Sequence, residues 1–321
     1  MNTGFKKFAR ALTGMTMAIM FIMASQAPAQ DGPTLSLHFD NLMPLNEAVD
    51  GLYEGWAIVD GAPVSTGVFN VNDMGEPVYP GGGSVIEEFI PASNITGATD
   101  IKISLEPVGD SDPGPSGLIV LGGAVSDEMA ELLTGLEAVD ATTACYILAT
   151  PSDNHVDDMN DDHGIWYLAM PGPEPGFMDL PDIGPSWTYE GWVVDISGGA
   201  PMPYSTGTFS VADDFDSDAA GPMGGGPPFP GQDFVEYQGG PVLDLDTGSF
   251  MAVVSIEPVP DNSPAPFQFK PLAGLIPEDG VGGMHFLNNQ TTATFPSGQA
   301  MLMGSVAVEN TSLTSVKAKF D

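Results

Sequence analysis

The feature that most constrains this 321-residue chain is an internal repeat of short sequence blocks. Each block occurs once in the first half and once in the second, in the same order, and the spacing grows from 136 to 140 and then to 151 residues. The pairs are Tyr53–Trp56 with Tyr189–Trp192, Ser65–Val71 with Ser205–Val211, and Ile103–Val108 with Val254–Val259. Asp110 and two nearby prolines also recur, as Asp261 and its prolines. Such order indicates a duplicated unit whose loops differ in length.

Within each unit the residue pattern is typical of β-strands. Apolar and polar residues alternate along 35–39 and along 101–105, which predicts strands with one buried face and places His38 on the solvent side. Gly67 and Gly207 interrupt strand-like runs, which predicts a bulge or a close backbone approach. Helix is expected only at Ser126–Val139, with Ser126 as the N-cap. We therefore predict an all-β fold of two tandem β-sandwich-like modules.

The first thirty residues have the composition of a secretory signal. A basic segment with Lys6, Lys7 and Arg10 precedes the mostly apolar stretch Ala11–Ala24, and Ala27-Pro28-Ala29 has the small-residue pattern that signal peptidase cleaves. The apolar stretch is shorter than the roughly 20 residues that span a bilayer. We predict a signal peptide over residues 1–29, cleavage near Ala29, and a secreted or periplasmic protein without a membrane span in the mature chain.

The remaining chain is predicted to divide into modules at residues 30–171 and 172–321. A hairpin of Ala144–Ala149 and Ile165–Met170 would close the first module, and the proline-rich segment Pro171–Pro185 would link it to the second.

The charge of the chain is strongly acidic, with 43 Asp and Glu against 7 Lys and Arg. Nucleic-acid binding requires cationic side chains that displace phosphate counterions, so the composition excludes nucleic acid as a partner.

The repeated blocks resemble the extracytoplasmic, C-terminal domain of anti-sigma-K factors of the RskA type. That family has a Tyr-x-x-Trp strand, an Asp-Gly-x-Pro-Val-Ser-x-Gly turn and strand, and an apolar strand that ends in Glu-Pro before a loop with spaced prolines. The matching residues here are Tyr53–Trp56, Asp60–Gly67 and Ser104–Pro115, and the second copy keeps most of them between Trp187 and Leu272. The resemblance implies two tandem copies of this domain, at about 35–123 and 187–272.

The chain also departs from that family. Anti-sigma factors of this type carry a cytoplasmic sigma-binding domain and a membrane span before the β domain, and here a predicted export signal stands in that place. No contact with a sigma factor is therefore expected, and shared domain architecture does not transfer regulation. The expected partner is an unknown extracytoplasmic protein or envelope component.

The sequence holds no recognised catalytic, cofactor or metal motif, so we assign no catalytic, cofactor-binding or metal residues and expect no enzyme. Cys145 lies in an apolar run, where a Cys is usually a small buried hydrophobe. Glu106 and Glu257 are interpreted as loop-capping or solvated acids, with paired functional acids as the alternative. In the acidic loop Asp153–Asp162, His155 and His163 flank four aspartates, which makes this the one dense ligand cluster of the sequence, with an imperfect calcium-loop pattern.

We therefore expect an exported, non-enzymatic β-sandwich protein that serves as a binding or envelope-interaction module. Two alternatives remain open from the sequence: a calcium-dependent adhesion or matrix protein, and a secreted hydrolase.

Overall fold

The computed structural model describes residues 32–152, 160–221, 224–235, 242–261 and 263–304. The predicted signal peptide and residues 153–159 of the acidic loop lie outside these ranges. Strands dominate the described chain, with a single four-residue α-helix, α1 (Thr291–Thr294), so the prediction of an all-β fold is confirmed. Within the described ranges, no helix has the length and apolar character needed to cross a membrane.

The first large sheet contains the first copy of the repeat. Its five antiparallel strands follow the order β4-β3-β2-β5-β6. Their bounds are β2 (Leu52–Val59), β3 (Ala62–Val71), β4 (Pro77–Val78), β5 (Asp100–Glu106) and β6 (Ile119–Ala124). The predicted strand over 101–105 is thus confirmed as β5.

The second large sheet contains the second copy, in the order β14-β13-β16-β17-β19. Its strands are β13 (Trp187–Asp195), β14 (Met202–Phe209), β16 (Phe250–Pro258), β17 (Phe269–Leu275) and β19 (Asn288–Asn289). The register matches that of the first sheet: Glu54 lies opposite Ser104, and Glu190 lies opposite Ser255. The repeated blocks therefore occupy the same places in four strands of equal order, β3-β2-β5-β6 and β14-β13-β16-β17, while the fifth strand, β4 or β19, lies at opposite edges of the two sheets.

Further sheets accompany these two. One is the three-stranded sheet β1-β20-β7, and another has the order β12-β8-β9-β15 with β18 paired to β8. The strands that complete the fold are β1 (Thr34–Asp40), β7 (Met129–Leu132), β8 (Thr143–Leu148), β9 (Gly164–Trp166), β10 (Leu168–Ala169), β11 (Glu174–Pro175), β12 (Phe177–Met178), β15 (Gly231–Asp233), β18 (Met284–Phe286) and β20 (Ser297–Met303). The 3₁₀ helices are η1 (Glu137–Ala141), η2 (Asp161–His163) and η4 (Leu245–Thr247).

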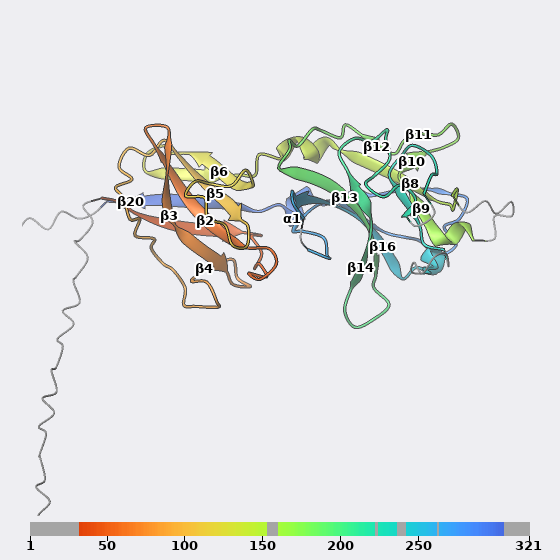
Figure 1. The fold of residues 1–321 in the computed structure, drawn as a ribbon, viewed down its shortest axis with the longest axis horizontal. Coiled ribbons are helices and arrows are strands. Elements are labelled where there is room, and N and C mark those ends of the chain that lie inside the picture. The colour runs from red at the N-terminus through yellow and green to blue at the C-terminus, as the bar shows by residue number, and fades with distance from the viewer. Residues whose placement is uncertain (1–31, 153–159, 222–223, 236–241, 262, 305–321) are drawn as a thin grey trace, which may run out of the picture.

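Strand pairing crosses the predicted boundary between residues 171 and 172 in both directions. The predicted hairpin is present, because β8 pairs with β9, but it joins β15 and β18 from the second half. Conversely, β20 returns near the C-terminal end of the described chain to pair with β1. Figure 1 shows this exchange: β20 lies with β2 to β6, whereas β8 to β12 lie beside β13 and β16. The proline-rich segment is not only a linker, since it contains β11 and β12.

The predicted helix over Ser126–Val139 is wrong. Asp127 and Glu128 have positive φ angles of 50° and 65°, and the backbone N–H groups of Ser126 and Met129 each donate to the other's carbonyl, which makes a tight turn. The next residues form β7, which pairs with β20, and η1 follows. Apolar residues at helical spacing favour a helix only weakly. Here the hydrogen-bond ladder to the distant strand β20 pairs the backbone groups that a helix would have paired.

The glycines of the repeat are explained by a bulge in each sheet. Gly67 and Gly207 have φ angles of +129° and +93°, and the strand register shifts beside them. On the neighbouring strand, a Cβ at Gly55 or Gly191 would lie 2.3 or 2.2 Å from a threonine Oγ1 of the bulge. The predicted bulges are therefore confirmed, and the glycine of each Tyr-Glu-Gly-Trp block makes room for them.

One hydrophobic core extends through both halves. It contains buried residues of both large sheets, among them Tyr53, Phe69, Tyr189 and Phe269, together with the buried side of β1. His38 on β1 is exposed, as predicted. A polar contact also joins the halves: buried Gln268 donates from Nε2 to the Tyr53 hydroxyl at 2.8 Å.

Trp56→Ala and Trp192→Ala should each lower the free energy of unfolding by about 3–5 kcal/mol, as truncation of a large buried aromatic does. Both indoles are only 2% exposed. Urea unfolding followed by circular dichroism measures the loss, with Met74→Ala, at a side chain that is 74% exposed, as the neutral control. Near-neutral tryptophan variants would contradict a structural role for these rings.

Candidate functional site

The side chains that face away from the main core carry a polar network. In the first sheet, Trp56 Nε1 donates to Ser104 Oγ at 2.8 Å, and the Ser104 hydroxyl donates to Glu106 Oε1. The second sheet repeats this chain, with Trp192 Nε1 donating to Ser255 Oγ at 2.7 Å and Ser255 donating to Glu257. Alternation along β2, β5, β13 and β16 places these residues on one face. A large indole covers each serine–glutamate pair.

Each of these glutamates also holds the loop that follows its strand. The backbone N–H of Ser116 donates to Glu106 at 3.1 Å, and that of Phe267 donates to Glu257 at 2.8 Å. This agrees with the loop-capping interpretation of both acids. Neither is solvated, because the exposed fraction is 5% for Glu106 and 0% for Glu257.

Two further acids accompany each glutamate, so every half has a carboxylate trio. The first trio is Glu54, Glu106 and Asp110, and the second trio is Glu190, Glu257 and Asp261. The first member of each trio accepts a hydrogen bond from a serine hydroxyl on the neighbouring strand, Ser65 or Ser205.

The second trio converges on one point. Glu190, Glu257 and Asp261 each offer a carboxylate oxygen, and these oxygens lie within 4.8 Å of one another. Glu190 is 5% exposed, and the Oε2 atoms of Glu190 and Glu257 are buried without a hydrogen-bond partner. Two carboxylates are thus held in place through Oε1 while Oε2 is left open.

Burial and mutual repulsion make these acids hard to ionise. Burial is the main reason that the pKa of Glu190 rises to about 7 and that of Glu257 to about 8, and the Asp261 charge raises the pKa of both further. Lys270 on β17 is the nearby cation; burial lowers its pKa, and the Glu257 charge partly offsets this. One lysine leaves the trio with an excess of negative charge.

The first trio is arranged differently. Its acids do not form such a close group within the described chain, and Glu54 is partly exposed. Both carboxylate oxygens of Glu106 have a partner, because the Ser116 N–H lies 3.1 Å from Oε1 and 3.3 Å from Oε2. Burial still raises the pKa of Glu106, and the Glu54 charge adds to it. The first trio therefore leaves no oxygen of its central glutamate open.

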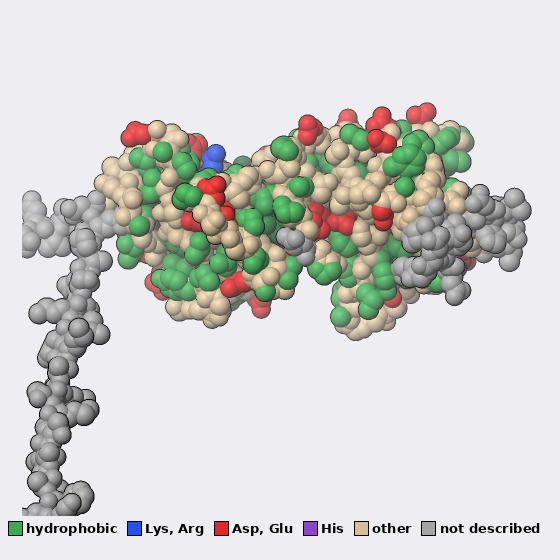
Figure 2. All heavy atoms as spheres, viewed as in Figure 1, with side chains coloured by type: hydrophobic (Ala, Val, Ile, Leu, Met, Phe, Trp, Pro, Cys, Tyr) green, Lys and Arg blue, Asp and Glu red, His purple; other side chains and the backbone are tan. Residues whose placement is uncertain are grey.

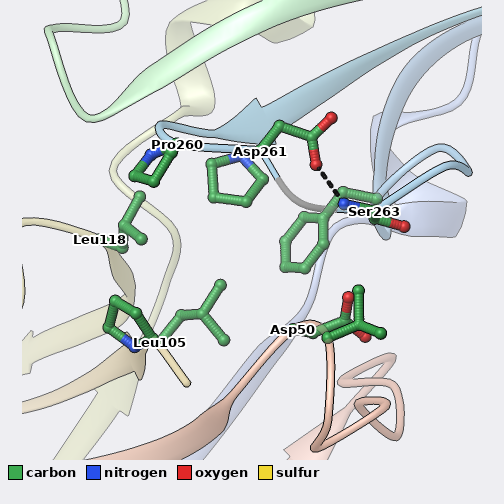
Figure 3. Close-up of a pocket in the computed structure, with 10 residues that line it drawn as sticks. Asp50, Leu105, Leu118, Pro260, Asp261 and Ser263 are labelled. Atoms are coloured by element: carbon green, nitrogen blue, oxygen red, sulfur yellow. Dashed lines mark hydrogen bonds between the residues drawn. The ribbon is translucent and has the colours of Figure 1, made fainter. Parts of the chain in front are cut away.

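Asp261 of the second trio lines a narrow cleft between the two halves. Leu105 and Leu118 line it from the first half, Pro260 and Asp261 line it from the second, and Asp50 stands across from them (Figure 3). Asp261 Oδ1 accepts the Ser263 N–H at 2.8 Å, which orients the carboxylate at the cleft wall. Asp261 is the member of the second trio that lines this cleft.

A second acid group involves the predicted acidic loop. Of that loop, residues 153–159 with His155 lie outside the described ranges, but Asp162 approaches Asp244 and Asp246 of the η4 region, with oxygens within 4.8 Å. Asp162 is 27% exposed, and His163 Nε2 lies 3.6 Å from its Oδ1. This group is more open to water than the second trio and has a histidine beside it.

Cys145 and His285 lie outside both acid groups. Cys145 is buried on β8, as predicted, and burial raises the pKa of its thiol. His285 Nε2 lies 2.7 Å from the Gly280 carbonyl oxygen.

Comparisons with known proteins give no relative: no protein-family model matches the sequence, and no curated protein or solved structure shows a significant similarity to it. The resemblance to anti-sigma-K factors therefore stays a prediction from the repeated blocks.

A buried aspartate beside β14 predicts how stability depends on pH. Asp216 Oδ2 accepts the Gly231 N–H at 2.8 Å, and burial, with the nearby Asp218 charge, raises the Asp216 pKa to about 7. In the unfolded chain an aspartate titrates near pH 4. Between about pH 4 and pH 7 the folded protein binds a proton that the unfolded chain has lost, so the free energy of unfolding falls as pH rises.

Asp216→Asn should make this fall shallower, because the amide oxygen still accepts the Gly231 N–H without titrating. Urea unfolding at intervals from pH 4 to pH 8 measures the slope, with exposed Asp213→Asn as the control. An unchanged slope in Asp216→Asn would show that other groups carry the dependence.

Proposed function

We propose that this protein is an exported β-sandwich protein without enzymatic activity, which acts outside the cytoplasm as a binding or envelope-interaction module. In this proposal its two repeat units are similar to the extracytoplasmic domain of anti-sigma-K factors. The observation that supports this proposal most is the structural role of the repeated serine–glutamate pairs. Such pairs resemble catalytic groups, but in both halves they are buried under tryptophan and bonded to backbone N–H groups.

The surface charge supports a choice of partner. Acidic side chains appear on both halves in Figure 2, whereas basic ones appear only on the first half in that view. With a net charge of −36, the chain attracts cationic groups and divalent cations and is repelled by nucleic acid and anionic lipid. A protein component of the envelope with a basic surface fits this charge.

Expression of the full chain in a bacterium, followed by fractionation, tests the proposal. The mature protein should start just after Ala29 by mass spectrometry and be recovered from the periplasm, envelope or medium. A matched variant with Lys6, Lys7 and Arg10 changed to Gln should accumulate uncleaved. Recovery of the wild-type chain in the cytosol with its leader intact would contradict export.

A calcium-dependent adhesion or matrix protein is the second candidate, and the two acid groups favour it. If it is correct, beads coated with the mature protein should bind cell-envelope preparations in millimolar calcium and be released by EDTA. Equal binding in calcium and in EDTA would remove this candidate and leave the first.

A further inference from the structure

We propose that Glu190, Glu257 and Asp261 form a binding site for a divalent cation, Ca²⁺, beside the cleft between the two halves. The inference rests on the geometry of the second trio and does not depend on where the protein acts. It differs from the acidic loop that the sequence suggested, since none of its ligands comes from that loop.

The spacing of the oxygens fits the ion. Ca²⁺ binds oxygen at about 2.3–2.6 Å, so two ligands on opposite sides of the ion lie about 5 Å apart and adjacent ligands lie closer. One oxygen from each residue of the second trio lies within 4.8 Å of the others, as such a site requires. One oxygen from each of the three carboxylates supplies three of the usual six to eight ligands, and water supplies the rest.

The unpartnered oxygens are the independent observation that points to a ligand. Buried carboxylate oxygens are normally hydrogen-bonded, because an unsatisfied one has lost its hydration without gaining a partner. Here two such oxygens, Glu190 Oε2 and Glu257 Oε2, are buried together. Their partner atoms Oε1 are already held by Ser205 and Ser255, so the side chains cannot simply turn away. A cation between the carboxylates satisfies both oxygens at once.

The donor set selects the kind of cation. All three side chains supply oxygen, which hard cations prefer, and neither histidine nor cysteine belongs to the group. Mg²⁺ demands short bonds in near-ideal octahedral geometry, whereas Ca²⁺ accepts an irregular arrangement, so a site built from two strand glutamates and a loop aspartate suits Ca²⁺ better. When all three carboxylates are ionised, Lys270 compensates at most one of their negative charges, and a divalent ion that displaces their protons neutralises the rest.

Binding would also have a structural consequence. Glu190 lies on β13 and Glu257 on β16, whereas Asp261 belongs to the loop that follows β16 and forms part of the cleft wall. An ion shared by the three would attach that loop to the sheet. Because the unfolded chain lacks the site, Ca²⁺ should raise the unfolding temperature.

The test uses the purified mature chain after dialysis against EDTA. Calorimetric titration with CaCl₂ should show a site that Asp261→Asn and Glu190→Gln each weaken at least tenfold, with loss of the Ca²⁺-induced rise in unfolding temperature. The first trio offers matched controls, because Asp110→Asn and Glu54→Gln change the equivalent residues and should leave affinity unchanged. Asp261→Asn is the main variant, since this loop side chain is partly exposed and its loss does not open the core.

Three outcomes would overturn the proposal. The first is the absence of Ca²⁺ binding up to millimolar concentration, which would mean that a shared proton alone satisfies Glu190 and Glu257. The second is binding that Asp261→Asn leaves intact and Asp244→Asn removes, which would place the ion at the Asp162 group. The third is equal weakening by Asp110→Asn. None of these results bears on export, which the fractionation experiment tests separately.

Discussion

In each half of this protein a tryptophan indole, a serine hydroxyl and a glutamate carboxylate form one buried hydrogen-bond chain, and the rest of the sheet is organised around it. The chain joins neighbouring strands on the face opposite the main core, and its glutamate then holds the N–H of the following loop. This hydrogen-bond network allows polar side chains to be buried on the second face, so that both faces of each sheet are buried. A buried carboxylate is costly unless its oxygens are satisfied, so the indole, the serine and the loop depend on one another.

The two copies of this hydrogen-bond network differ at the loop that follows the glutamate. Ser116 bonds to both oxygens of Glu106, whereas Phe267 bonds to a single oxygen of Glu257. The second copy therefore has open carboxylate oxygens beside Asp261, at the cleft where the halves meet. Of the two similar frameworks, the first has both oxygens of Glu106 hydrogen-bonded, whereas the second leaves Oε2 of Glu257 without a hydrogen-bond partner. This difference of one hydrogen bond is the basis of the cation site that we propose.

Much of the local structure could be predicted from residue patterns. Alternation predicted β1 and β5, glycines within strand-like runs predicted the bulges, and the Glu-Pro blocks predicted loop caps. The helix predicted at Ser126–Val139 is wrong although the apolar residues have helical spacing. The reason is that β7 pairs with β20, which lies more than 150 residues away in the sequence. The domain boundary near residue 171 was predicted because prolines are frequent there. Proline frequency indicates local stiffness of the backbone, and it does not reveal the strands with which β8 and β20 pair.

The site residues show the same division. By itself, the sequence determined that both copies carry an acid in the Tyr-x-Gly-Trp block, one before proline and one in the next loop, and this threefold recurrence was a signal available before any coordinates. Only the tertiary structure decided that Glu190, Glu257 and Asp261 each bring an oxygen within 4.8 Å of the others, whereas their counterparts form no such close group among the described residues. The type of each side chain and the period of the apolar–polar pattern are local properties of the sequence. The distance between carboxylates on two strands and a loop depends on strand register and on which backbone N–H the loop presents, and these are set by packing across the whole fold.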